Sequence, residues 1–398
     1  MPAFIDAPVT DIDTWSFRVS GWVAAAVEGS PVHLEINDRQ ISPLLFKNQS
    51  LAAALPSFGF VRHIVADVNL LDIDRLDGDQ LGHQSVSIKL GVGADVASRD
   101  LPITETLLRG LSEQLELRAQ TKQWCMSRLR CPVCKEPNAL QFGDAIVFCS
   151  SCAARFPQSV GTIDMLPPEL RQKAKLTPAT HVSSNPYEEL ALDLIRRITD
   201  AGGWVLDCGA GSRPSRMPRV VNLEIERYFS TDVLALGENL PFQDGVFDGV
   251  VSLATLEHVR DPFTCARELV RVVKPGGEVV CSVPFLQPVH GYPDHYYNMT
   301  RNGLINLFED VAAIVDCSTP PNGHPIFAVQ WILHEYLDGL PIAQRDRFGR
   351  MTIAEVAQLD PFRMLGDGIA ADLSEPAKAG IACLNTVRLR RHEKAAPP

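Results

Sequence analysis

The sequence predicts an α/β protein with a mostly parallel sheet, preceded by a small metal-binding unit and a β-rich N-terminal domain. The sheet is indicated by Trp204, Val205 and Leu206, an apolar run that leads to Asp207 and a glycine-rich turn, as buried parallel strands do. The metal-binding unit is indicated by two CxxC pairs between residues 131 and 152. The N-terminal domain is indicated by alternating apolar and polar residues with turn signals between them.

Composition and charge limit the classes of function. The chain has 398 residues, 45% hydrophobic and 21% charged, which is typical of a globular protein with two or three domains. The net charge of −11 disfavours a large nucleic-acid-binding surface. No apolar run approaches the roughly 18 residues of a membrane span, and residues 1–10 lack the pattern of a secretory signal. Ten cysteines, with four in CxxC pairs, favour metal binding in a reducing compartment, so we expect a cytoplasmic protein.

Residues 1–105 are expected to form a sandwich-like accessory domain. Alternating runs at residues 15–23, 32–36, 60–68 and 86–90 predict its strands. Trp15 and Trp22 allow two interpretations: they fill the core, or they are stacking platforms for a carbohydrate or a protein partner. A partner protein or a second copy of the chain would bind through this domain. Residues 106–128 follow as a helical linker, because leucines at 107, 108, 111 and 115 share one helical face.

Cys131, Cys134, Cys149 and Cys152 predict a zinc site within residues 129–166. Each CxxC directs two thiolates toward one point, and the 14 residues between the pairs are typical of a four-thiolate shell. Such a shell has no open position for water, so we expect a structural and not a catalytic metal. Cys125 lies outside the pattern, and residues 167–184, which are polar and contain prolines, are expected to form a linker.

Residues 185–391 contain the turn after Asp207, in which Gly209 and Gly211 let the backbone approach a ligand closely. A dinucleotide-binding fingerprint would need a third glycine at position 214 and an acid about 20 residues further on. Position 214 is proline, and the next acid at a strand end, Glu224, comes sooner. The acid at position 207 suits a cationic amino-acid cofactor better than a pyrophosphate, and Glu224 is placed to accept hydrogen bonds from a ribose diol.

Four further motifs follow this turn in order. They are Leu240-Pro241-Phe242, Phe247-Asp248, Leu256-Glu257-His258-Val259 and Lys274-Pro275-Gly276-Gly277. With them, residues 186–391 resemble the class I S-adenosylmethionine-dependent methyltransferases, in the branch that acts on small molecules. The resemblance implies a Rossmann-like seven-stranded sheet and methyltransferase activity. Residues 129–166 resemble the zinc-ribbon activator subunit of certain RNA and translation-factor methyltransferases, here fused ahead of the catalytic domain.

The resemblance also implies S-adenosylmethionine as the cofactor, with Asp207 at its methionine portion and Glu224 at its ribose. Two features depart from the family. Only 11 residues, two of them prolines, separate Gly211 from Leu223, so the usual first helix is very short or missing. Leu236 stands where many relatives have an acid that contacts adenine, so we expect backbone groups to bind the adenine here. The implied cofactor contacts are Asp207, Gly209, Gly211, Glu224, Leu236, Gly237, Leu253 and His258.

The predicted catalytic residues are His258, His290, His295 and Tyr296. They follow the fourth and fifth strands, whose carboxyl ends face the ligand crevice in sheets of this kind. Histidine suits proton removal near neutral pH, so one of them is a candidate base; the alternative is an aromatic lid that packs the domain. Residues 311–317 and 380–389 are expected to be the last two strands. Residues 320–380 are expected to be an acceptor-side insertion with a helix at 326–340, and residues 392–398 a disordered tail.

The sequence therefore favours in-line methyl transfer to a small hydroxyl or carboxyl acceptor, such as a glycan sugar. Two alternatives stay open. The first is a non-catalytic cofactor-binding scaffold, which the two departures from the family favour. The second is a methyltransferase of tRNA or of a translation factor, which the ribbon suggests and the acidic charge disfavours for tRNA.

Overall fold

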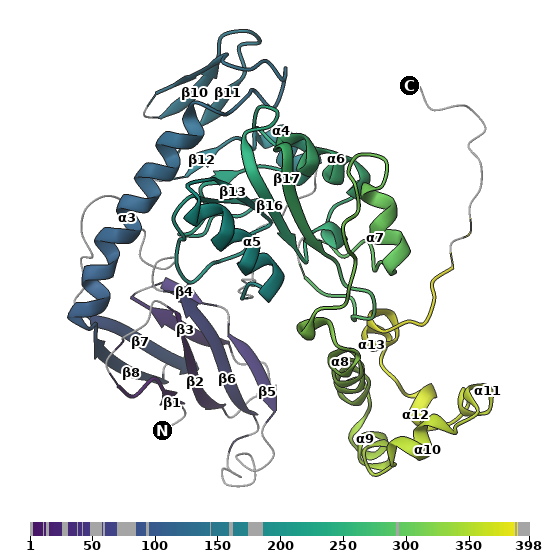
Figure 1. Cartoon of the computed structure of the whole chain (residues 1–398). Helices are drawn as coiled ribbons and strands as arrows, with labels where there is room; N and C mark the ends of the chain where they lie inside the picture. The colour runs from purple at the N-terminus through teal and green to yellow at the C-terminus, as the bar shows by residue number, and fades with distance from the viewer. Residues whose placement is uncertain are drawn as a thin grey trace.

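The computed structural model describes residues 3–10, 12, 16–25, 31–37, 39–41, 43–47, 58, 60–69, 85–92, 95–143, 145–158, 162–173, 186–291, 294–386 and 388. Along the chain, two antiparallel sheets are followed by a long helix, a three-stranded ribbon, a six-stranded parallel sheet and a group of C-terminal helices (Figure 1). Among the described residues, none of the helices has both the length and the apolar character needed to cross a membrane.

The two N-terminal sheets have four strands each, and all neighbouring strands are antiparallel. Alternate side chains such as Val19, Val23, Leu34 and Ile88 are fully buried between them, as the alternating sequence predicts. One sheet contains β1 (Ala3–Ala7), β2 (Ser16–Ala25), β6 (Phe60–Asn69) and β5 (Leu44–Lys47). The other contains β4 (Arg39–Ile41), β3 (Val32–Ile36), β7 (Ser85–Val92) and β8 (Asp95–Pro102).

Trp22 does not fill this core. It lies between the inward-facing positions of β2, is half-buried, and stacks on Phe4 with ring centroids 6.1 Å apart. Because side chains alternate along a strand, Val19 and Val23 take the core positions and place Trp22 on the outer face. The core-filling interpretation is therefore wrong for Trp22, and Trp15 lies outside the described residues.

A single helix, α3 (Glu105–Met126), joins the sandwich to the ribbon (Figure 1). Its first turn is capped by Thr104, whose hydroxyl accepts from the N–H of Leu107. The helical linker expected over residues 106–128 is thus one helix, which is 22 residues long and corresponds to about 33 Å. Near its end Trp124 stacks on Trp204, with ring centroids 4.2 Å apart, so the helix is packed along the parallel sheet.

The parallel sheet has the strand order β12-β15-β14-β13-β16-β17. Glu224, which the sequence places at a strand end, is the last residue of β14. The strands are β12 (Ile163–Asp164), β15 (Val233–Leu234), β14 (Val220–Glu224), β13 (Val205–Cys208), β16 (Phe247–Leu253) and β17 (Val273–Ser282). The fold class predicted from the sequence is confirmed.

Helices cover both faces of this sheet. Buried residues of α5 (Glu189–Asp200) pack with Val205 and Val251, while those of α6 (Pro262–Val272) pack with Leu206 and Val250. Neighbouring residues of a strand point to opposite faces, so the two helices lie on opposite sides. A further helix, α7 (Arg301–Phe308), packs against α6.

The edge strand β12 comes from the chain just after the ribbon. The N–H of Ile163 donates to the carbonyl of Asp232 at 2.8 Å, and the N–H of Met165 donates to that of Leu234 at 3.0 Å. The segment just after the ribbon thus contributes an edge strand to the parallel sheet. The chain continues into α4 (Pro168–Lys173), within the predicted linker.

The two predicted final strands are wrong. Residues 311–317 form no strand, and Val315 among them is 97% exposed. Residues 381–386 and 388 form no strand either, because α13 (Glu375–Gly380) ends where the second strand was expected to begin. An edge hairpin needs both of its strands, and among the described residues no strand pairs with the apolar run at 311–317. Within the described residues the sheet has six strands instead of seven, with β17 at one edge.

The predicted helix at 326–340 is α8 (Pro325–Asp338). Five short helices follow it and share a small core that includes Leu340, Phe348 and Leu373. They are α9 (Ile342–Gly349), α10 (Ile353–Ala357), α11 (Pro361–Met364), α12 (Gly368–Ala371) and α13 (Glu375–Gly380).

Candidate functional site

The four predicted metal ligands lie together in the ribbon. Sγ of Cys131 is 3.7 Å from that of Cys152, and Sγ of Cys134 is 3.6 Å from that of Cys149. All four sulfur atoms lie within 4.8 Å of one another. A tetrahedral zinc site with Zn–S bonds of about 2.3 Å would place its sulfurs about 3.8 Å apart, so the cluster fits zinc.

The ribbon fold creates this cluster locally. Its sheet contains β9 (Leu140–Phe142), β10 (Ile146–Cys149) and β11 (Arg155–Pro157). After each CxxC the chain turns back, so that the N–H of Lys135 donates to Cys131 and that of Ala153 to Cys149, both at 2.9 Å. Lys135 and Ala153 have positive φ values of 65° and 61°, which complete the two tight turns.

The ribbon is bound to the loop that follows β15. The N–H of Arg130 donates to the carbonyl of Pro241, and the N–H of Gln243 donates to that of Arg128, both at 2.9 Å. The Arg130 guanidinium also pairs with Glu268 of α6 at 3.3 Å, and both side chains are largely buried. The ribbon therefore holds the loop at residues 239–243, directly after the predicted adenine-binding position.

The predicted cofactor residues come from adjacent strand ends. The N–H groups of Gly209 and Ala210 donate to Leu223 at the end of β14, and the N–H of Gly211 donates to Oε1 of Glu224 at 2.7 Å. The N–H of Ala235 donates to the carbonyl of Glu224 at 3.0 Å. These bonds bring the turn after β13 and the ends of β14 and β15 to one carboxyl edge, as the fold class requires.

Glycine is required at position 209. Its φ is +77°, and a Cβ there would lie 2.2 Å from Oγ1 of Thr255 in the loop after β16. Gly211 also has a positive φ, of 64°. The glycine-rich turn therefore fits closely against the end of β16, where Leu253 lies half-buried.

Asp207 is fully buried and is already bound within the protein. Its Oδ2 accepts from the hydroxyl of Tyr187 at 2.6 Å and from the guanidinium of Arg213 at 2.8 and 2.9 Å. Arg213 stacks on the Tyr187 ring, 3.8 Å from its centroid. Oδ1 of Asp207 has no protein partner among the described residues, so it is the atom free to accept from a cofactor amine. Tyr187 and Arg213 were not predicted from the sequence; the basic residue directly after the glycine-rich turn was the available signal.

A second buried ion pair stands where the first helix of the family would be. Arg216 pairs with Asp232, and both side chains are 2% exposed. The N–H of Arg216 also donates to the side chain of Gln114 in α3 at 2.6 Å. The connection at residues 209–219 contains no helix, as predicted, and these bonds fix it instead.

Glu224 uses both carboxylate oxygens on backbone donors: Oε1 on Gly211 and Oε2 on Ile225, at 2.7 and 2.9 Å. Burial raises the pKa of Glu224, and the two backbone bonds oppose that rise. A carboxylate offers about four lone-pair sites, so these bonds leave room for a ribose hydroxyl. The residues present thus fit the ribose of S-adenosylmethionine.

Leu236 and Gly237 begin the short helix η1 (Gly237–Asn239). A Cβ at Gly237 would lie 2.8 Å from Sγ of Cys265 in α6, so this glycine is needed for packing on that helix. Leu236 is half-buried at the start of η1. Its binding role, like that of the other cofactor residues, stays a prediction.

Three predicted catalytic residues form a histidine cluster. The rings of His258, His290 and His295 have centroid distances of 4.6 to 5.4 Å. His258 lies in η2 (Leu256–His258) after β16, and the other two lie in the loop after β17. Burial lowers the pKa values of His258 and His290, so both imidazoles are neutral near pH 7.

The three histidines differ in which nitrogens are free. Nδ1 of His258 donates to the carbonyl of Asp294 at 2.7 Å, and Nδ1 of His290 donates to that of Pro288 at 2.8 Å. In the neutral form each Nε2 therefore has a lone pair. Nδ1 of His295 accepts from the N–H of His290, and its Nε2 lies 3.0 Å from Oδ1 of Asn298. A base role fits His258 or His290 better than His295.

Tyr296 serves the cluster mainly through its backbone. Its N–H donates to the carbonyl of Glu257 at 2.7 Å and fixes the loop against η2. Its hydroxyl donates to Asp294 at 2.8 Å. Burial, followed by the neighbouring Asp294 carboxylate, raises the pKa of the Tyr296 phenol. A catalytic role for this phenol stays a prediction.

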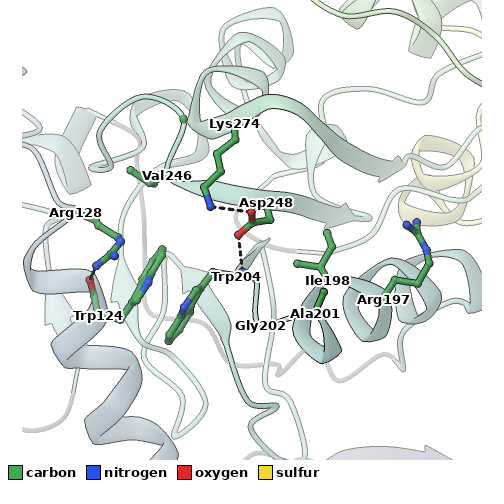
Figure 2. A pocket seen from close by; sticks show the side chains of 12 residues that line it. Trp124, Arg128, Arg197, Ile198, Ala201, Gly202, Trp204, Val246, Asp248 and Lys274 are labelled. Carbon is green, nitrogen blue, oxygen red and sulfur yellow. Dashed lines mark hydrogen bonds and ion pairs between the residues drawn. The ribbon is translucent and has the colours of Figure 1, made fainter.

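A separate hollow of about 770 Å³ lies at the opposite, amino edge of the sheet. Figure 2 shows the stacked rings of Trp124 and Trp204 on one side of it and Asp248 held by Lys274 and the N–H of Trp204. Trp204 and Val246 precede β13 and β16, so this hollow is remote from the predicted site. Ligands of such sheets bind at the carboxyl edge, and we interpret the hollow as the seam between α3 and the sheet.

Comparison with known proteins agrees with this arrangement. Residues 215–281 match the family model described as a methyltransferase domain. The demethylmenaquinone methyltransferase of Bacillus licheniformis is 41% identical over 101 residues, which cover 25% of this chain and 44% of the relative. An uncharacterized methyltransferase of Mycobacterium sp. (strain JLS) is 44% identical over 73 residues, or 17% of this chain and 29% of the relative. The chain thus spans less than half the length of either relative.

Among solved structures, phosphoethanolamine N-methyltransferase 2 of Haemonchus contortus matches with 17% identity and a TM-score of 0.27. The match covers 45% of this chain and 46% of that one. The Trm112 methyltransferase activator complex of Haloferax volcanii matches with 17% identity and a TM-score of 0.22, over 32% of this chain and 76% of that one.

Proposed function

We propose that this protein is an S-adenosylmethionine-dependent methyltransferase acting on a small hydroxyl or carboxyl acceptor, such as a sugar of a glycan. One observation carries the proposal: the matched residues 215–281 contain the strand ends that place Glu224, Leu236, Leu253 and His258 at a single carboxyl edge. The chain spans only part of the proteins that share this segment, so the activity of the whole protein is part of the proposal.

Different residues of this edge contact different parts of the cofactor. Oδ1 of Asp207 accepts from the amino group of the methionine portion, and Glu224 accepts from the ribose hydroxyls. The backbone at Leu236 and Gly237 borders the adenine. When bound, S-adenosylmethionine supplies a methyl group on a sulfonium, which is already a good leaving group.

The histidine cluster forms the acceptor side. It adjoins Thr255, which packs on Gly209, and Trp331 of α8 lies 5.1 Å from the His290 ring. In the proposed reaction the acceptor oxygen bonds to the methyl carbon as the carbon–sulfur bond breaks, and the proton of the acceptor leaves through this cluster. The chain mainly positions the acceptor and controls that proton.

The non-catalytic scaffold remains the competing function. It is favoured by the backbone bonds that occupy both oxygens of Glu224 and by the helix-free connection after β13. A methyltransferase of tRNA or of a translation factor has only the ribbon in its favour. We propose a cytoplasmic location, where reduced thiolates persist.

Turnover separates an enzyme from a scaffold. The full chain is incubated with S-adenosylmethionine and a set of sugars and hydroxy acids, and formation of S-adenosylhomocysteine is measured. We expect acceptor-dependent turnover that falls about 10²–10⁴-fold in His290→Ala, while cofactor affinity and melting temperature change little. The matched control is His334→Ala, an exposed histidine of α8.

Binding of the cofactor without turnover on any acceptor would favour the scaffold. A melting temperature that falls in His290→Ala, with full activity per folded molecule, would favour a purely structural lid.

A further inference from the structure

The carboxylate of Glu257 lies beside two of the histidines. One donor atom from each of Glu257, His258 and His290 lies within 4.8 Å of the others, and Oε1 of Glu257 is 3.8 Å from Nε2 of His258. We propose that these three side chains bind a divalent first-row transition-metal ion, at a site separate from the four cysteines. Two imidazoles and one carboxylate are a ligand set that such ions accept.

The two imidazoles are oriented as metal ligands are. Each donates its Nδ1–H to a backbone carbonyl, His258 to Asp294 and His290 to Pro288. A second hydrogen bond of this kind fixes the tautomer and directs the Nε2 lone pair, and it accompanies most metal-binding histidines. The planes of the two rings are at 89° to each other, with centroids 5.4 Å apart.

Glu257 provides the independent observation. Its side chain is fully buried, and neither carboxylate oxygen has a hydrogen-bond partner among the described residues. Burying a carboxylate without a partner is costly, and a buried charge is normally paired or bound to a metal. Among the described residues, the group of opposite-charge type that lies beside this carboxylate is the His258 imidazole, whose Nε2 is 3.8 Å away and outside hydrogen-bond distance.

The loop that brings His290 to the site is anchored to η2 by backbone hydrogen bonds. The N–H groups of Tyr296 and Tyr297 both donate to the carbonyl of Glu257, at 2.7 and 3.2 Å. Gly291 has φ +82°, and a Cβ there would lie 2.3 Å from Cε1 of His258. Only glycine allows this approach, so the backbone itself preserves the spacing of the two imidazoles.

The donor set selects the class of ion. Calcium and magnesium prefer oxygen ligands, and the four-thiolate ribbon suits zinc, whereas nitrogen and oxygen together suit manganese, iron, cobalt, nickel or zinc. Three protein ligands leave coordination positions open. If the proposed methyltransferase function holds, these positions would take the acceptor oxygen, and the two metal-bound imidazoles would hold the ion instead of acting as the base. The metal-binding part does not depend on that function.

Titration with Co²⁺ tests the site. The full chain is titrated while visible absorption and heat are recorded, because thiolate-bound Co²⁺ gives intense charge-transfer bands and nitrogen–oxygen sites give only weak d–d bands. We expect one equivalent with weak bands only, and a higher melting temperature once it is bound. Glu257→Gln and His290→Ala should each weaken this equivalent by at least about 100-fold, and the control His334→Ala should retain it.

The proposal is overturned if the parent chain takes up no weak-band equivalent, or if Glu257→Gln binds Co²⁺ within a few-fold of the parent. Glu257→Gln keeps the shape of the side chain, so it decides the question if His290→Ala does not fold. Binding of S-adenosylmethionine is measured separately on the same preparations. If the parent chain takes up Co²⁺ but does not bind S-adenosylmethionine, the proposed function is rejected and the metal site is retained.

Discussion

Single residues of the candidate site have partners within the protein beside the ligand-binding roles proposed for them. Asp207 was predicted from its position before the glycine-rich turn, and the structure adds that Arg213 balances its charge and Tyr187 donates a hydrogen bond to it. No sequence pattern predicts such a pairing, because it depends on the fold, which brings residues 187, 207 and 213 together. The histidines could be predicted as a group from their loop, but the free nitrogens and the unpartnered Glu257 required coordinates.

Removing Asp207 should destabilise the protein. Arg213 is 6% exposed, so Asp207→Ala removes the carboxylate partner of a buried charge, and we expect a loss of about 3–5 kcal/mol in urea unfolding. Asp207→Ala/Arg213→Met removes both charges and should recover most of that loss. A double variant no more stable than the single one would show that the pair is not what holds this region.

At the scale of elements, the chain's strands and helices follow local sequence where they have enough residues to show a pattern. Strands β14 and β16 end where their apolar runs end, followed by an acid or a loop. The two-residue strand β12 is too short to show a periodic pattern, and the apolar run at 311–317 has no partner strand within the part of the chain that the structure describes. Tertiary pairing decided both cases, which is why sequence reasoning missed them.

The start of α6 gives a pH-dependent prediction. Asp261 caps the helix by accepting from the N–H and hydroxyl of Thr264, and these bonds lower the pKa of its carboxyl. Asp261→Ala should cost about 1 kcal/mol at neutral pH. Because the folded pKa is lowered, the ionic part of this contribution is complete above about pH 3.9 and is lost as pH falls through the folded value.

Chemical unfolding of parent and variant at matched pH values measures this difference. Asp261→Asn is the control, since asparagine caps a helix but does not titrate, and its difference from Asp261→Ala should not change with pH. A parent-to-alanine difference that grows on acidification would contradict the assignment.

The ribbon should hold one zinc per chain. Elemental analysis of Cys131→Ser/Cys149→Ser should find one zinc per chain fewer than the parent, while Cys383→Ser, an exposed cysteine outside the cluster, should keep the parent's zinc content. Because the ribbon binds the loop at residues 239–243, the double variant should also bind S-adenosylmethionine more weakly. A zinc content in the double variant equal to that of the parent would show that these thiolates are not the ligands.

At the scale of the whole molecule, contacts link the sandwich, the ribbon and the parallel sheet to one another. Helix α3 packs on the sheet through Trp124, the ribbon holds the loop after β15, and β12 extends the sheet (Figure 1). The order of these parts and the class of the sheet could be predicted from motifs and periodicity. Their mutual packing could not, because it depends on long-range contacts such as that between Gln114 and Arg216.

Calorimetric titration of the full chain with S-adenosylmethionine tests whether the carboxyl edge of the parallel sheet binds this cofactor. We predict saturable binding, weakened by about 1.5–3 kcal/mol in Glu224→Ala, since a charge-assisted hydrogen bond to the ribose is lost. Glu309→Ala, an exposed acid at the end of α7, should bind as the parent does. No heat of binding from the folded parent chain, or equal affinity in Glu224→Ala, would contradict the account.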